Sequence, residues 1–121
     1  MRMGRPFETV DEGGAITFVL RMSGVPVAVK VDPPLVVLRV DIGSIPARAA
    51  NNRETLFEHL LHLNATALVH SSYGIDGDGI VLGASMELEN LDYNEFDAVF
   101  IDIDLALAQH LAHIRKLAAA T

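Results

Sequence analysis

Four of the five histidines fall in two pairs whose spacing could bring imidazoles together. His59 and His62 are three residues apart, as are His110 and His113. Side chains at this spacing share a face of a helix, and two imidazoles on one face are the beginning of a metal site. Neither pair has its third ligand, and no helical His-Glu-x-x-His sequence occurs. Exposed or half-buried helix histidines are the simpler interpretation, and a metal-dependent enzyme or sensor is the alternative.

Other polar residues do not form a catalytic set. His70 is next to Ser71, but neighbouring strand residues point to opposite faces of a sheet, so the two cannot act in line. Asp76 and Asp78 fit the start of a calcium-binding loop, yet Ile80 stands where an oxygen ligand is needed. The chain has no cysteine, which excludes thiol nucleophiles and zinc-thiolate sites. We expect no catalytic residues, no cofactor and no metal.

The composition is that of one small globular domain. The chain has 121 residues, half of them hydrophobic, so it can bury a core without disulfide bonds or metal. Residues 1–14 lack periodicity and predict a flexible lead-in, followed by a single domain over residues 15–121. No export signal and no apolar run of membrane-spanning length occur, so we expect a cytoplasmic protein that does not bind membranes.

Charge is unevenly distributed along the chain. The net charge is −7, and residues 54–114 contain eleven acidic residues but no lysine or arginine. An acidic surface repels phosphate backbones, so we expect no binding to nucleic acid. Such a surface can attract a basic polypeptide. The simpler interpretation is that these acids keep an apolar domain soluble.

Periodicity predicts five strands and two helices. Alternation of apolar residues indicates three successive strands, and a period of 3.6 then indicates a helix that Asn51 or Asn52 caps. The sequence Asp-Gly-Asp-Gly at 76–79 predicts the turn of a hairpin, and Asp92 with Glu95 forms the capping pair of a long amphipathic helix. The predicted strands are 16–22, 25–31, 35–42, 68–75 and 80–88, and the predicted helices are 51–64 and 92–117.

These elements predict an α+β fold with an antiparallel sheet in the order β-β-β-α-β-β-α. Both helices are expected on one face of the sheet, because each has one apolar stripe to bury. The other face of the sheet then stays open, although several of its residues are apolar. Exposed apolar patches of this kind often mark protein contacts. We expect Val37, Val69 and Tyr73 to form a partner-binding surface on this open face.

The final helix carries more apolar surface than one stripe needs. Ile101, Leu105, Ala108 and Ala112 lie on a flank outside the stripe that faces the sheet. A single layer of sheet cannot cover both the stripe and this flank. We therefore expect these four residues to form a dimer interface.

Three segments together resemble a known superfamily. They are the leucine-rich segment 56–64, which ends in Leu61-His62-Leu63-Asn64, the glycine-turn hairpin 73–82, and the segment Met86–Asp92 that leads into the last helix. They are similar to type III secretion chaperones of the Tir-chaperone type and to the related YbjN-like proteins. The resemblance covers about residues 15–117. It departs from the family's pattern at the start, because the chain lacks the usual helix before the first strand.

The resemblance implies a homodimer that binds another polypeptide and performs no chemistry. In the chaperone branch the client is a partly unfolded effector wound across apolar patches, whereas the YbjN-like branch implies a regulatory role. Our leading interpretation is therefore a non-catalytic, dimeric protein-binding domain. Two alternatives stay open: the histidine-based metal enzyme or sensor, and a structural subunit of a larger assembly.

Overall fold

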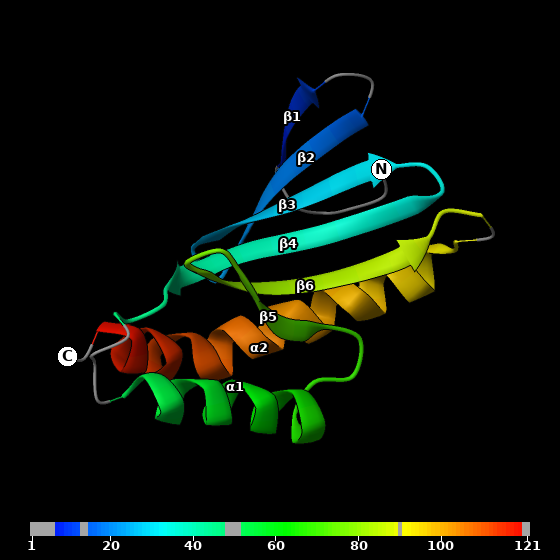
Figure 1. The fold of residues 1–121 in the computed structure, drawn as a ribbon. Coiled ribbons are helices and arrows are strands. Elements are labelled where there is room, and N and C mark those ends of the chain that lie inside the picture. The colour runs from blue at the N-terminus through cyan, green and yellow to red at the C-terminus, as the bar shows by residue number, and fades with distance from the viewer. Residues whose placement is uncertain (1–6, 13–14, 48–51, 90, 120–121) are drawn as a thin grey trace.

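A computed structural model describes residues 7–12, 15–47, 52–89 and 91–119, with side-chain burial from residue 17 onward. Its elements form one six-stranded sheet and two helices (Figure 1). The strands are β1 (Phe7–Glu12), β2 (Ala15–Met22), β3 (Val25–Asp32), β4 (Leu35–Ser44), β5 (Ser72–Asp76) and β6 (Gly79–Glu87), and the helices are α1 (Arg53–Thr66) and α2 (Tyr93–Ala119).

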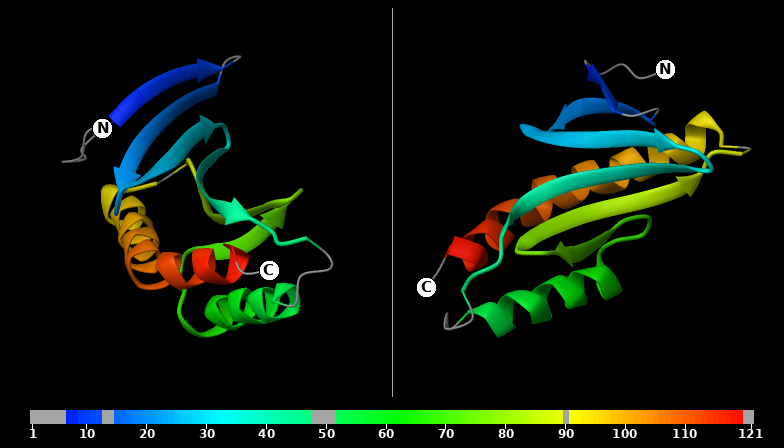
Figure 2. Two further views of the ribbon diagram at one scale, coloured as in Figure 1. Left: turned by 90° about the vertical axis from the view of Figure 1, so that its left-hand side faces the viewer. Right: turned by 45° about the horizontal axis from the view of Figure 1, so that its top comes forward.

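The sheet is antiparallel throughout, with the strand order β1-β2-β3-β4-β6-β5. Both helices pack on the same face of the sheet, and the other face carries no helix of the described chain (Figures 1 and 2). The predicted α+β class, the antiparallel sheet and the placement of both helices on one face are thus confirmed. No helix precedes β2 in the described residues.

The strand β1 is the main difference from the predicted order. Its register pairs Thr9 with Phe18 and Val10 with Thr17, so the sheet has one strand more than the sequence analysis expects. The expectation of a flexible lead-in is therefore wrong over Phe7–Glu12. Three acidic residues in this segment hide the alternation of its apolar ones, and pairing with β2 supplies the backbone hydrogen bonds that hold it extended.

Turn chemistry connects the strands as expected. Ser23 and Gly24 have φ angles of 51° and 78°, the two positive values of a tight turn that matches the twist of a hairpin. Gly77, with a φ of 60°, reverses the chain between β5 and β6. These turns fix the register of the strands, and with it the face on which each side chain lies.

The core lies between the sheet and the two helices. Alternate residues of β3, β4 and β6 are fully buried, among them Val29, Leu38 and Leu82, and Phe100 and Ile103 of α2 pack against them. The Asp92 carboxylate accepts a hydrogen bond from the Glu95 N–H at 2.7 Å, which confirms the predicted cap of α2. Of the two predicted caps of α1, Asn51 lies outside the described residues. Asn52 occupies the N-cap position, but its side chain makes no capping hydrogen bond.

Candidate protein-binding surfaces

The outward face of α2 carries an apolar stripe made of the four residues predicted as a dimer interface. Ile101 and Leu105 are 48% and 52% exposed, and Ala108 and Ala112 are also exposed. Their spacing of four, three and four residues keeps them on one line along the helix, as in the seam of a coiled coil. We call this set the α2 stripe. The opposite side of the same helix, which includes Phe100 and Ile103, is buried against the sheet.

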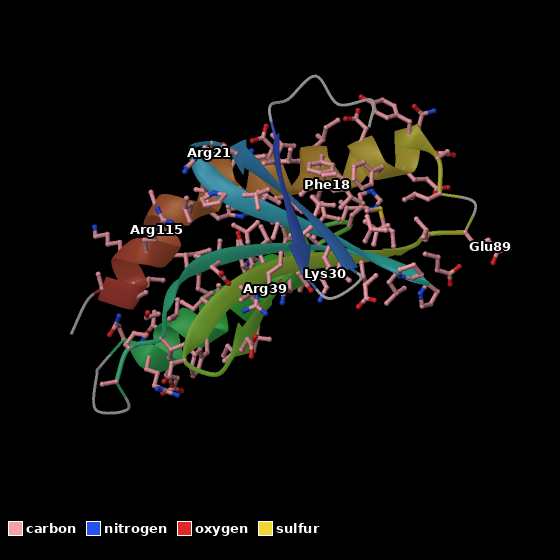
Figure 3. The ribbon with its side chains drawn as sticks, turned by 90° about the horizontal axis from the view of Figure 1, so that it is seen from above. Phe18, Arg21, Lys30, Arg39, Glu89 and Arg115 are labelled. Carbon is pink, nitrogen blue, oxygen red and sulfur yellow. The ribbon has the colours of Figure 1, made fainter. Side chains whose placement is uncertain are left out.

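The face of the sheet turned away from the helices is apolar along its centre and charged around it. Val37 and Val81 are half-buried there. Lys30 and Arg39 lie on the same face (Figure 3). Arg39 is held by two carboxylates, with Nε 3.2 Å from Asp41 Oδ1 and Nη1 2.6 Å from Asp76 Oδ2. We call this surface the open sheet face.

Val69 and Tyr73, predicted to share the open sheet face with Val37, lie elsewhere. Val69 is 79% exposed, but it belongs to the connection between α1 and β5. Tyr73 pairs with the core residue Leu82 and is only 6% exposed, so the expectation that it faces a partner is wrong. The strand begins at Ser72 and not at residue 68, and the register of β5 on β6 turns Tyr73 toward the helices.

Tyr73 instead joins β5 to both helices. The Asn64 side chain accepts a hydrogen bond from the Tyr73 N–H at 2.7 Å and donates one to the Tyr73 carbonyl at 3.0 Å. It thus satisfies the backbone of Tyr73 as a neighbouring strand would. The Tyr73 hydroxyl lies 3.2 Å from His110 Nδ1 on α2. Burial, with a smaller effect of the Asp102 charge, raises the pKa of Tyr73 to about 12, which keeps the phenol neutral.

Asp102 fixes the connection between α1 and β5, and sequence reasoning missed this role. Its carboxylate accepts hydrogen bonds from the backbone N–H groups of Val69, His70 and Ser71 at 3.0 to 3.3 Å, and from the Ser71 hydroxyl at 2.7 Å. Burial alone would raise the pKa of Asp102, but these hydrogen bonds lower it below its ordinary value. The sequence gives no local signal for the contact, because Asp102 is about thirty residues from its partners.

The two predicted histidine pairs meet through one member of each. The rings of His59 and His113 are 4.7 Å apart between centroids, at the contact of α1 with α2. His110 is engaged with Tyr73, and His62 is exposed. Burial, and then the neighbouring imidazoles, lowers the pKa of His59, and burial lowers that of His110. Within the described residues, no group of three or more His, Cys, Asp or Glu side chains could hold a metal ion.

Three hollows lie around the start of α2 and the second half of β6. One, of about 240 Å³, is lined mostly by apolar residues that include Val36 and Phe96. A second, of about 510 Å³, lies between Met86 and the first turns of α2. The third, of about 410 Å³, is on the open sheet face above Gly83. All three are shallow surface features and belong to surfaces that could contact another chain.

Comparison with known proteins identifies the family. The family model CesT_Tir_1, which describes type III secretion chaperones, matches residues 2–120. The chain belongs to this family. The structure is also similar to a chain in the heterodimeric ExoU-SpcU complex from the type III secretion system of Pseudomonas aeruginosa. That match has a TM-score of 0.66 and 16% sequence identity, and it covers 87% of this chain and 84% of the other.

The likeness to the ExoU-SpcU chain shows a shared fold, in agreement with the superfamily resemblance of the sequence. A comparison with curated proteins found no match. None of the described helices has the length and apolar character needed to cross a membrane. The family and the fold thus direct attention to the exposed surfaces.

Proposed function

We propose that this protein is a non-catalytic, cytoplasmic chaperone-like dimer that binds another polypeptide through exposed apolar surface. Membership of the type III secretion chaperone family supports protein binding without catalysis. The complex named in the structural match, ExoU with SpcU, is a heterodimer of two different proteins. This precedent supports a polypeptide as the partner of the present chain.

The observation that carries the proposal is the division of α2 into two apolar faces. One face is buried in the core through residues such as Phe100 and Ile103, and the other is the exposed α2 stripe. A helix that served only its own core would be polar on its outward side. We assign the α2 stripe to self-association, because a straight apolar seam on a long helix can pair with a copy of itself.

The open sheet face, including Val37, and the exposed Val69 are then the surfaces for the partner. They do not overlap the α2 stripe in sequence, so a dimer would present two copies of each to a client polypeptide. Two linked copies of one binding surface raise the overall affinity for an extended chain without any new kind of contact.

Capture of the partner tests the proposed function. The full-length tagged protein is expressed in its source organism, crosslinked and purified, and each recovered polypeptide is then co-expressed with the chain. We expect a co-purifying partner that resists proteolysis better in the complex than alone. A matched bait carrying Val37→Asp and Val69→Asp should recover less of it. Failure to recover any partner with crosslinking, while a control bait captures its own, would refute the proposal.

A further inference from the structure

The contact between the two helices brings together one histidine from each predicted pair. α1 and α2 lie side by side on the same face of the sheet (Figures 1 and 2). His59 of α1 and His113 of α2 meet at this contact, with 4.7 Å between their ring centroids and 81° between the ring planes. A metal site built from these histidines requires the two helices to be neighbours, and the fold meets that requirement.

The spacing of the two imidazoles suits coordination of one metal ion. A Zn²⁺–N bond is about 2.0–2.1 Å long and the ring centroid lies about 1.1 Å beyond the nitrogen, so the centroid is about 3.2 Å from the metal. Two coordinated rings are then about 4.5 Å apart at an N–Zn–N angle of 90°, and about 5.2 Å apart at the tetrahedral angle. The observed distance of 4.7 Å lies between these values.

The orientation of the rings is compatible with a shared ion. The two rings lie edge to face, and rotation about the Cβ–Cγ bonds would direct one nitrogen of each toward a common point. His110 is engaged with the Tyr73 hydroxyl, at 3.2 Å from its Nδ1. Because no set of three or more ligands exists in the described part of the chain, a bound ion would keep water at its other positions.

The surroundings favour the neutral imidazole, which is the form that binds metal. Burial, and then the imidazoles of His113, His110 and His62, lowers the pKa of His59. A neutral ring has an unprotonated nitrogen whose lone pair can coordinate an ion, so a metal does not have to displace a proton near neutral pH.

We propose that His59 and His113 form a two-histidine site for a divalent late transition-metal ion, such as Zn²⁺ or Ni²⁺, that joins α1 to α2. Imidazole nitrogen suits these ions, whereas Mg²⁺ and Ca²⁺ prefer oxygen ligands. Asn64 of α1 holds the backbone of Tyr73 in β5, so an ion that fixes α1 also stabilises the edge of the sheet. The site is separate from the proposed binding of a polypeptide.

Thermal unfolding of the full-length protein tests the site. The protein carries no histidine tag, because a tag would bind the same ions. Circular dichroism gives the melting temperature in EDTA, and then in NiCl₂, ZnCl₂ or MgCl₂ at equal concentration. We expect Ni²⁺ and Zn²⁺ to raise the melting temperature by about 5 °C, and Mg²⁺ to change it by less than about 1 °C.

Single substitutions locate the ion. His59→Gln and His113→Gln should each abolish the rise in melting temperature, because one imidazole alone binds the ion much more weakly. His70→Gln, in the exposed connection between α1 and β5, should keep the full rise. The three variants have equal numbers of histidines, so binding of metal to their unfolded chains is matched. Each rise is measured from the variant's own melting temperature in EDTA, which separates metal binding from a change in the stability of the fold.

Isothermal titration calorimetry with NiCl₂ gives a readout that does not depend on unfolding. We expect one ion per chain, with an affinity at least about tenfold weaker in His59→Gln or His113→Gln. The double variant should lose little more than either single variant, because both histidines serve one ion. The affinity of the parent should fall in mild acid, where protons compete for the imidazoles.

Four results would overturn the inference. They are no response of the parent to Ni²⁺ or Zn²⁺, an equal response to Mg²⁺, and a rise in melting temperature that persists in both His59→Gln and His113→Gln. The fourth is a metal-dependent increase in mass in light scattering that His62→Gln abolishes, since this would place the ion between copies through an exposed histidine. None of these results concerns the polypeptide partner, so this inference can fail while the proposed function stands.

Discussion

At the scale of single residues, Asn64 connects a helix to an edge strand. Its carboxamide makes two hydrogen bonds to the backbone of Tyr73, at 2.7 and 3.0 Å. A carboxamide has both a donor and an acceptor, so it can satisfy one residue of a strand edge as a neighbouring strand would. Asn64 therefore closes the edge of β5 at the point where the buried Tyr73 enters the core.

Replacing this side chain should destabilise the fold. We expect Asn64→Ala to lower the free energy of unfolding by about 2 kcal/mol, because it leaves a partly buried N–H and carbonyl of Tyr73 without partners. Urea unfolding followed by circular dichroism measures the change. Asn94→Ala, at an exposed position of α2, is the matched control and should change stability by less than about 0.5 kcal/mol. Equal effects of the two substitutions would contradict the role of Asn64.

Asp102 leads to a second prediction, on the dependence of stability on pH. Asp102→Asn should lower the free energy of unfolding by about 2 kcal/mol at neutral pH, because the carboxylate accepts four hydrogen bonds from Val69, His70 and Ser71. Since the pKa of Asp102 is lowered in the folded protein, its contribution is present above the unfolded pKa and is lost as the pH falls through the folded pKa.

Unfolding of this variant and the parent should therefore differ at neutral pH and converge in acid. Asp97→Asn, on the same helix, serves as the control and should change stability little. A constant difference between parent and Asp102→Asn from neutral to acidic pH would show that the charge of Asp102 is unimportant.

Contacts between residues close in sequence could be predicted, whereas contacts between distant residues could not. The cap formed by Asp92 and Glu95 was predictable, because both partners lie within one turn. The contacts of Asp102 and Asn64 depend on how the connection between α1 and β5 folds back on the helices. The face of Tyr73 depends on the same connection, since a strand that starts at Ser72 pairs in a register that periodicity alone does not specify.

At the scale of secondary structure elements, the contact of α1 with α2 is sensitive to protonation. His59 and His113 lie ring against ring across it, and the pKa of His59 is lowered by burial and by the neighbouring imidazoles. His110 lies on the same helix as His113 and also has a lowered pKa, because of burial. Protonation in the folded state would place positive charges side by side between the helices.

Stability should consequently decrease in mild acid. The unfolded chain takes up protons at histidine near pH 6.5, before the folded protein does, so the free energy of unfolding falls as the pH drops through and below that value. His59→Gln should flatten this dependence, as seen in thermal unfolding measured across the range. His70→Gln, outside the helix contact, should leave the dependence unchanged. A parent protein whose stability rises as the pH drops through this range would contradict the account.

Most elements could be predicted from the sequence, because each had its own period and turn chemistry. The strands β2, β3, β4 and β6 and both helices follow apolar patterns that continue for several residues. The strand β1 could not be predicted, since its acids interrupt the alternation and its extended form depends on pairing with β2. The surfaces were predicted in part: the α2 stripe is exposed as expected, whereas Tyr73 is buried.

At the scale of the whole molecule, the proposed self-association depends on a second apolar face of α2. The α2 stripe is separate from the core, and its four residues are exposed in the single chain. Burying such a stripe against its copy would remove exposed leucine and isoleucine side chains from water in both subunits. Self-association through α2 would leave the open sheet face of each subunit available for a client.

A single charged substitution should separate the two copies. Leu105→Glu would place a carboxylate at the centre of the α2 stripe, where pairing would bring two like charges together in an apolar contact. Leu61→Glu introduces the same change at a position of α1 that is 68% exposed, and it is the matched control. Both variants should fold, since neither side chain belongs to the core.

Light scattering coupled to size-exclusion chromatography at micromolar concentration measures this directly. The account predicts twice the chain mass of 13.1 kDa for the parent and for Leu61→Glu, and the mass of one chain for Leu105→Glu. A parent protein with the mass of a single chain, and with stability unchanged on dilution, would contradict the assignment of the α2 stripe to self-association.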